Sequence, residues 1–162
     1  MYNWIVLLHV LSVMVFLMVH GVALAVAFQI RAEKNLERAR GLLELSASMY
    51  ATLYPALVLI LLTGIVLAFM GNWWHQGWIW AALILFVVEV GAMSGIARRE
   101  YLPLRRALGL RLVVNGRVQP AAGPSNDSEA LALLERTRPA LLAAIGGVGL
   151  VLIFWLMILK PF

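Results

Sequence analysis

Long apolar stretches recur four times along the chain and are separated by segments rich in polar residues. They cover residues 4–28, 50–70, 77–97 and 139–159. A helix of about 20 apolar residues crosses the hydrocarbon core of a bilayer. Glu89 is the one formally charged residue within these stretches. The pattern predicts an all-α fold, an integral membrane four-helix bundle that forms a single transmembrane domain over residues 1–162.

Composition supports this prediction and excludes several classes of protein. Hydrophobic residues make up 63% of the chain and charged residues 13%, against about 45–50% and about 25% in soluble domains. A soluble globule of this length cannot bury so much apolar surface, so we expect neither a soluble enzyme nor a nucleic-acid partner. The chain has no cysteine, which excludes disulfides, thiolate metal sites and iron–sulfur clusters.

The basic residues predict how the bundle is oriented in the membrane. Twelve of the 13 lysines and arginines lie between the first and second or between the third and fourth stretches, and only Lys160 lies elsewhere. The positive-inside rule then makes loops 29–49 and 98–138 cytoplasmic. Both termini are expected outside, in a bacterial-type inner (plasma) membrane. Aromatic residues are expected to form a belt at the outer interface: Tyr2, Trp4, Trp73, Trp74, Trp78, Trp80 and Trp155.

The second basic loop contains the least membrane-like sequence of the chain. Residues 116–128 are rich in Pro, Gly, Ser and Asn and predict a turn-rich insert. Ser128 or Asp127 is expected to cap a short helix from Glu129 to Thr137 that leads into the fourth span. Small residues four apart, at Gly91 and Gly95 and at Ala143 and Gly147, are expected to allow close contact between helices.

Ionisable groups inside the spans are the candidates for function, because burying them in lipid is costly. They are His9, His20 and Glu89. His9 and His20 are eleven residues apart, which places them within about 20° around a helix, with Ser12 and Phe16 on the same side. We expect this face to point into the bundle, with His9 in the outer third of the membrane and His20 toward the inner third.

The chemistry of these groups is open at this point. An imidazole can bind haem iron, magnesium or copper, or it can form a hydrogen bond to a neighbouring helix. Glu89 is expected at the depth of His20. It is then either bonded to His20, where it orients a ligand or forms part of a proton path, or a neutral carboxyl bonded to a backbone carbonyl.

Four short motifs carry a resemblance to a known family. They are Met1-Tyr2-Asn3-Trp4 followed by His9, Pro55-Ala56 followed by Thr63-Gly64, Arg98-Arg99, and Leu159-Lys160-Pro161-Phe162. Together they resemble the HemJ-type bacterial protoporphyrinogen oxidases, which are small four-helix membrane proteins. The chain is equally similar to the allied CopD-like group of uncharacterised predicted integral membrane proteins.

The resemblance implies a b-type haem whose iron is held by His9. Gly64 would leave clearance for the macrocycle, and His75 or Met157 would supply a second axial ligand. Ser12, Phe16, His20 and Glu89 would complete the cofactor-binding surface, His20 and Glu89 as a second polar site or proton route. The oxidase family also carries a His and a Lys early in its third helix, where this chain has Trp78-Ile79-Trp80-Ala81-Ala82. No residue is therefore assigned as catalytic.

Three functions follow from these observations. The first is a haem-b membrane redox protein, an electron-transfer protein or an oxidase-like oxidoreductase. Its partners would be the lipid bilayer and a quinone, a porphyrin or other membrane subunits, with a homo-oligomer as a further option. The second is a cofactor-free accessory subunit of a larger membrane complex. The third is a transporter or channel, for which one Glu and no inverted repeat offer little.

Overall fold

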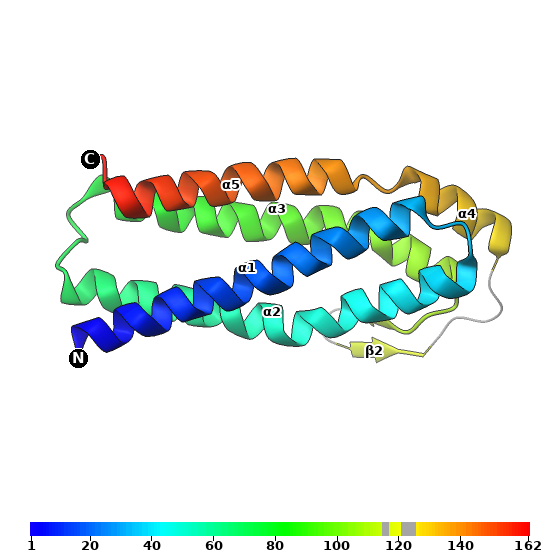
Figure 1. Ribbon diagram of the computed structural model, residues 1–162, viewed down its shortest axis with the longest axis horizontal. Helices are drawn as coiled ribbons and strands as arrows, with labels where there is room; N and C mark the ends of the chain where they lie inside the picture. The colour runs from blue at the N-terminus through cyan, green and yellow to red at the C-terminus, as the bar shows by residue number, and fades with distance from the viewer. Residues whose placement is uncertain (115–116, 121–125) are drawn as a thin grey trace.

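Helices form nearly all of the structure, a computed structural model that describes residues 1–114, 117–120 and 126–162 (Figure 1). Their bounds are Tyr2–Ala32 for α1, Leu36–Met70 for α2, Gly77–Ala107 for α3, Asp127–Arg136 for α4 and Pro139–Leu159 for α5. A short antiparallel ladder joins β1, Leu112–Val114, to β2, Arg117–Gln119. The prediction of an all-α four-helix membrane fold is confirmed, and this ladder is a minor addition to it.

Four helical segments are long and apolar enough to cross a membrane, namely α1, α2, α3 and the stretch Asp127–Leu159. They extend well beyond the predicted spans. With 31 and 35 residues, α1 and α2 are about 46 and 52 Å long, against a hydrocarbon core of about 30 Å. The predicted loop 29–49 is therefore mostly helix, because its Leu, Glu, Arg and Ala residues are good helix formers, and the connection is reduced to residues 33–35.

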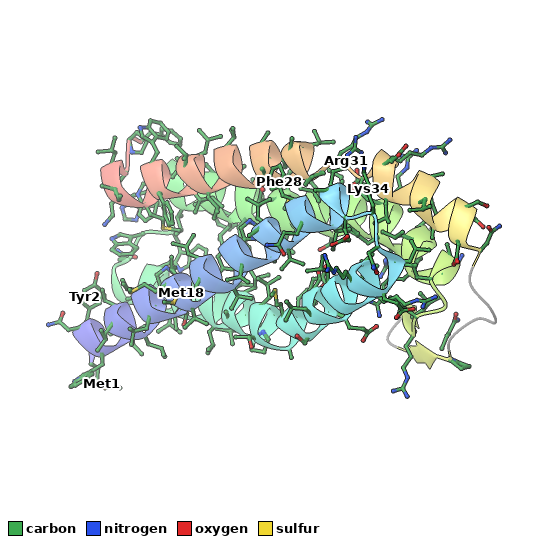
Figure 2. All side chains as sticks on the ribbon, turned by 45° about the vertical axis from the view of Figure 1, so that its right-hand side comes forward. Met1, Tyr2, Met18, Phe28, Arg31 and Lys34 are labelled. Atoms are coloured by element: carbon green, nitrogen blue, oxygen red, sulfur yellow. The ribbon has the colours of Figure 1, made fainter. Side chains whose placement is uncertain are left out.

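The two ends of the bundle differ in character. Both termini and the α2–α3 connection lie at one end, whereas the α1–α2 connection, α4 and the β1–β2 ladder lie at the other (Figure 1). Arg31 and Lys34 lie at the end opposite to Met1 and Tyr2 (Figure 2). We call the end that holds Arg31 and Lys34 the basic end, and the end that holds the termini the aromatic end.

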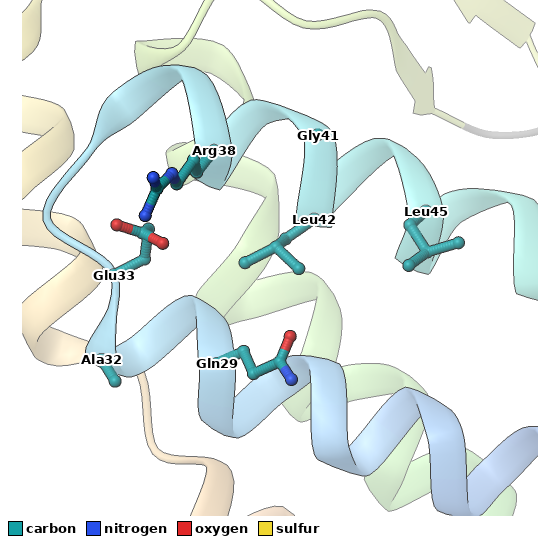
Figure 3. Close-up of a pocket in the computed structure, with 7 residues that line it drawn as sticks. All are labelled: Gln29, Ala32, Glu33, Arg38, Gly41, Leu42 and Leu45. Carbon is teal, nitrogen blue, oxygen red and sulfur yellow. The ribbon is translucent and has the colours of Figure 1, made fainter.

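The tight turn at residues 33–35 is held by side chains that bind backbone groups. The Glu33 carboxylate accepts the N–H groups of Asn35 and Lys34, at 2.9 and 3.0 Å. The Asn35 side chain in turn accepts the first free N–H groups of α2, from Glu37 and Arg38. The hydrogen bond from Asn35 lowers the pKa of Glu33. Glu33 and Arg38 point toward one another across a shallow hollow beside this turn (Figure 3).

The long helices pack as two pairs. α1 packs along α2 and α3 packs along α5, whereas contacts between the pairs, including those between α2 and α3, are sparse. The membrane supplies no hydrophobic force between helices, so their association depends on close packing and hydrogen bonds. Space is therefore left between the two pairs, and the candidate site is built around it.

The basic end has a small hydrophobic core of its own, contributed by α1, α2, the end of α3, and α4. Its fully buried members include Ile30, Leu104, Leu108 and Leu134. The amphipathic helix α4 covers this core. Asn126 caps α4 by accepting the Glu129 N–H. The expected caps were wrong, because Asp127 is already the first helical residue and the Ser128 hydroxyl donates to the Asn126 side chain.

The remainder of the turn-rich insert is only partly described. Within the range 116–128, residue 116 and residues 121–125 lie outside the described part of the chain. The short helix that was expected to follow is confirmed, but it begins two residues earlier than predicted and ends at Arg136.

At the aromatic end, tryptophans pack on one another and on the chain terminus. Trp78 is 1% exposed, and its ring centre lies 5.4 Å from that of Trp73. The backbone N–H of Trp78 donates to the Phe162 carbonyl. The Lys160 Nζ lies 4.2 Å from the Trp73 ring centre, a cation–π distance. The expected belt is therefore divided, since Trp4, Trp80 and Trp155 are exposed while Trp78 belongs to the interior.

Arg105 ties the basic end together. Its guanidinium donates to the Leu43 carbonyl at 3.0 Å, to Glu44 at 2.7 Å, and to the Arg111 carbonyl. We expect Arg105→Ala to lower the free energy of unfolding by about 2–3 kcal/mol, because it removes charge-assisted hydrogen bonds to Leu43 and Glu44, a class of bond worth about 1.5–3 kcal/mol. Thermal unfolding in detergent, followed by circular dichroism, measures the change.

The matched control is Arg106→Ala. Arg106 carries the same charge one position along the chain but is exposed, so its loss is expected to change stability by less than about 0.5 kcal/mol. Equal losses for the two variants would show that charge at this end, rather than the hydrogen bonds of Arg105, supplies the stability.

Candidate functional site

His9 projects from α1 against α2, where it meets a threonine. Its Nδ1 lies 2.8 Å from the Thr63 Oγ1. The Thr63 hydroxyl donates its own hydrogen within α2, to the carbonyl of Leu59. Because that hydrogen is used, Thr63 accepts from His9, which fixes the imidazole as the Nδ1–H tautomer. The lone pair of His9 is then on Nε2.

Gly64 lies beside the same imidazole. A Cβ at this position would lie 3.5 Å from the His9 Cε1. The space that Gly64 provides is thus occupied by the edge of His9, where the sequence had indicated clearance for a macrocycle. Thr63 and Gly64 together position the Nδ1–Cε1 edge of the ring against α2, so Nε2 is directed away from Thr63.

The other predicted residues on this face of α1 behave in two ways. Ser12 is buried, and its hydroxyl donates to the Leu8 carbonyl in its own helix at 2.8 Å. It therefore has no free hydrogen to offer a cofactor. Phe16 and His20 stack on each other, with ring centres 5.2 Å apart and planes inclined by 22°. The prediction that His9, Ser12, Phe16 and His20 share a face is consistent with these inward contacts.

His20 and Glu89 line one cavity, but no hydrogen bond between them is found in the described part of the chain. The His20 Nε2 lies 3.2 Å from where a Cβ on Gly146 would be, and the Glu89 carboxyl lies against Gly149. The Glu89 Oε1 is buried with no hydrogen-bond partner among the described residues. Of the two alternatives for Glu89, the bond to His20 is therefore not made in this arrangement, because each side chain packs on its own α5 glycine.

The cavity itself lies between the two helix pairs and has a volume of about 490 Å³. It extends along α3 from Glu89 to Arg105, and Phe16 and His20 form part of its α1 wall. Cavities of about 300–1,000 Å³ are typical of small-molecule sites in proteins. His9 is not part of its lining, so the two histidines belong to two distinct places in the bundle.

The two candidate second ligands lie at the aromatic end. His75 is exposed in the α2–α3 connection, and Met157 packs against the buried tryptophan cluster. Neither has a hydrogen bond or ring contact with His9 within the described residues. Those residues also contain no group of three His, Cys, Asp or Glu side chains suited to a metal ion. Binding of a metal by several such side chains is not supported here, whereas a haem needs only one histidine.

Sequence analysis did not identify Gly146 and Gly149, the glycines that contact site residues. Cβ atoms at Gly91, Gly95 and Gly147 would meet nothing within 4 Å, so these three glycines make no close contact with another helix in the described part of the chain. Gly146 and Gly149 make such contacts instead. A one-residue shift turns a helix by about 100°, and the evenly apolar sequence of α5 does not indicate which side faces α3.

Thr63 was also missed as a site residue, although the sequence places it directly before Gly64. Its role depends on a contact across 54 residues, which the local pattern does not reveal.

Comparison with protein-family models, curated proteins and solved structures gave no match.

Proposed function

We propose that the chain is a haem-b-binding membrane redox protein in which His9 supplies an axial ligand to the iron. The observation that supports this most directly is the His9–Thr63 hydrogen bond. A histidine that binds a metal commonly donates its other ring N–H to an oxygen, which fixes the tautomer and makes the free nitrogen more basic. His9 has this arrangement, with Thr63 as the acceptor and Nε2 as the ligating atom.

The proposal assigns one protein ligand, His9 on α1, to the haem iron. His75 and Met157 are the candidates for a second ligand, since both belong to the end of the bundle that holds His9. When bound, the haem supplies one-electron transfer, and the axial ligands and their surroundings tune its potential. The contribution of this chain is to hold His9 in one tautomer through Thr63 and to exclude water with apolar helices.

We infer the orientation from charge. The basic end lies in the cytoplasm and both termini lie outside, in a bacterial-type inner membrane, because 12 of the 13 lysines and arginines cluster between paired helices. The apolar helices are compatible with direct contact with the lipid bilayer. A quinone, a porphyrin or other membrane subunits are the redox partners consistent with this function, and a second copy of the chain is a further partner.

The deciding experiment is an optical spectrum of the protein purified from haem-replete cells, followed by a pyridine haemochrome assay. We expect a Soret band and haem b in an amount equimolar with the chain. Protein that is folded yet free of pigment would overturn the proposal. Isolation from native membranes in a stable pigment-free complex would then support the alternative, an accessory subunit.

A further inference from the structure

The cavity between the helix pairs is long and narrow. Glu89 and Arg105 both line it and are 16 residues apart on α3, a rise of about 24 Å. Its volume of about 490 Å³ is thus spread along a large part of α3. The space therefore suits one extended chain or one flat ring rather than a bulky ligand.

Glu89 gives one end of this cavity its polarity. Its Oε1 is buried and unpartnered among the described residues, although its carboxyl already lies against Gly149 on α5. A buried polar atom without a hydrogen bond is costly. A ligand hydroxyl at this end would donate the missing bond to the carboxylate, a ligand carbonyl would accept one from the protonated carboxyl, and the stacked rings of Phe16 and His20 offer the ligand a flat wall.

Most of the exposed lining of the cavity lies on α2 and α3, which share few contacts. Tyr50 and Tyr54 on α2 and Ser94 and Arg98 on α3 line it and are exposed as well. An opening between two membrane helices admits a ligand dissolved in the bilayer. The ligand would therefore be lipophilic, with its polar group at the Glu89 end and its tail toward the opening.

The arginines at the other end offer no buried, uncommitted partner to an anionic ligand. Arg105 is the cationic side chain best placed inside the cavity, but its guanidinium is already used by Leu43, Glu44 and Arg111. Arg98 and Arg111 are exposed. No cation of the described lining is both buried and uncommitted, so a fatty-acid carboxylate would find no buried partner.

We propose that this cavity binds the head group of a lipid-soluble quinone or quinol, with Glu89 as its hydrogen-bonding partner and the Phe16–His20 pair as its stacking wall. The choice of a quinone as the ligand rests on the proposed redox function, whereas the cavity and the Glu89 contact do not depend on it. It concerns a site separate from His9, so haem binding and quinone binding fail or succeed independently.

The test is binding of a ubiquinone analogue with a decyl tail to the purified protein in nanodiscs of neutral lipid, by equilibrium titration. We expect saturable binding, at one analogue per chain. Glu89→Met keeps the length of the side chain but removes its oxygens, and it should weaken binding about tenfold, the value of one hydrogen bond. His9→Ala should leave the affinity unchanged even though it removes the proposed haem ligand.

Tyr101→Phe is the matched control. Tyr101 also lines the cavity with a buried hydroxyl that has no partner among the described residues. It lies 12 residues from Glu89, about 18 Å along α3, and is beyond the reach of the same ring. Its affinity should stay within about twofold of the parent chain. Thermal unfolding of both variants checks that they fold, and Gly149→Ala, which displaces the Glu89 carboxyl, tests the same contact from α5.

Two outcomes would overturn the proposal. One is failure of the analogue to bind, or equal affinity in the folded Glu89→Met variant. The other is saturable binding of oleate that Tyr101→Phe weakens and Glu89→Met does not, which would assign the cavity to an anionic single-chain lipid with its head at the basic end.

Discussion

Replacing His9 with alanine is expected to abolish haem binding, because no other histidine of the described chain lies at the α1–α2 contact to bind the iron. The Soret band of the purified protein should disappear, and the pyridine haemochrome assay should detect no haem b. The fold is expected to persist, because His9 is only half-buried. A neighbour that loses contact with its ring is Gly64, which has no side chain. Near-unchanged thermal unfolding of the variant would show this.

His20→Ala serves as the control for this experiment. His20 belongs to the separate cavity and packs against Gly146, so its removal should leave the Soret band in place. If His20→Ala loses the haem and His9→Ala keeps it, the assignment of the ligand to His9 is wrong.

Thr63 acts through His9 as a positioning residue. Thr63→Val keeps the shape of the side chain but removes the acceptor for the His9 Nδ1–H. Loss of such a supporting group typically costs about 10–100-fold in metal affinity. The reduction potential should also shift, because the ligating nitrogen becomes less basic, and Thr63→Ser should restore both. A merely structural role for Thr63 would leave the potential unchanged in the haem that remains bound.

The sequence was sufficient for properties that depend on local periodicity. The length of each apolar stretch predicts four spans, and the spacing of His9, Ser12, Phe16 and His20 predicts a shared face. Both properties are fixed within a single helix. The polar residues beyond the spans were harder to interpret, because a charged segment such as 36–49 continues a helix as readily as it forms a loop.

Properties that depend on how helices face one another were not predictable in the same way. Gly147 and Gly149 are two residues apart in an evenly apolar helix, and only Gly149 meets another side chain. The cap of α4 depends on which of three consecutive polar residues, Asn126, Asp127 or Ser128, directly precedes the first helical residue. The partner of His9 lies on another helix, and the cavity exists because α2 and α3 are held apart. Each is set by tertiary packing.

A second large effect is expected at the basic end, for Leu104→Ala. Leu104 is 0% exposed in the core that α4 covers. The helices there extend beyond the length that spans the hydrocarbon region, so water, not lipid, is the alternative environment for this side chain. The hydrophobic effect then acts in full. The free energy of unfolding is expected to fall by about 2–5 kcal/mol, the range for replacing a buried leucine with alanine, which leaves a cavity.

Ile84→Ala is the matched control, on the same helix but within the predicted span. Ile84 is 62% exposed and faces outward, where lipid tails are as apolar as the side chain that they contact. Its truncation should change the free energy of unfolding by less than about 0.5 kcal/mol. Unfolding of both variants by guanidinium in bicelles, followed by far-ultraviolet circular dichroism, compares them directly. If Leu104→Ala costs no more than Ile84→Ala, the basic end is not a water-facing core, and α4 must be held against α3 by something other than the burial of Leu104.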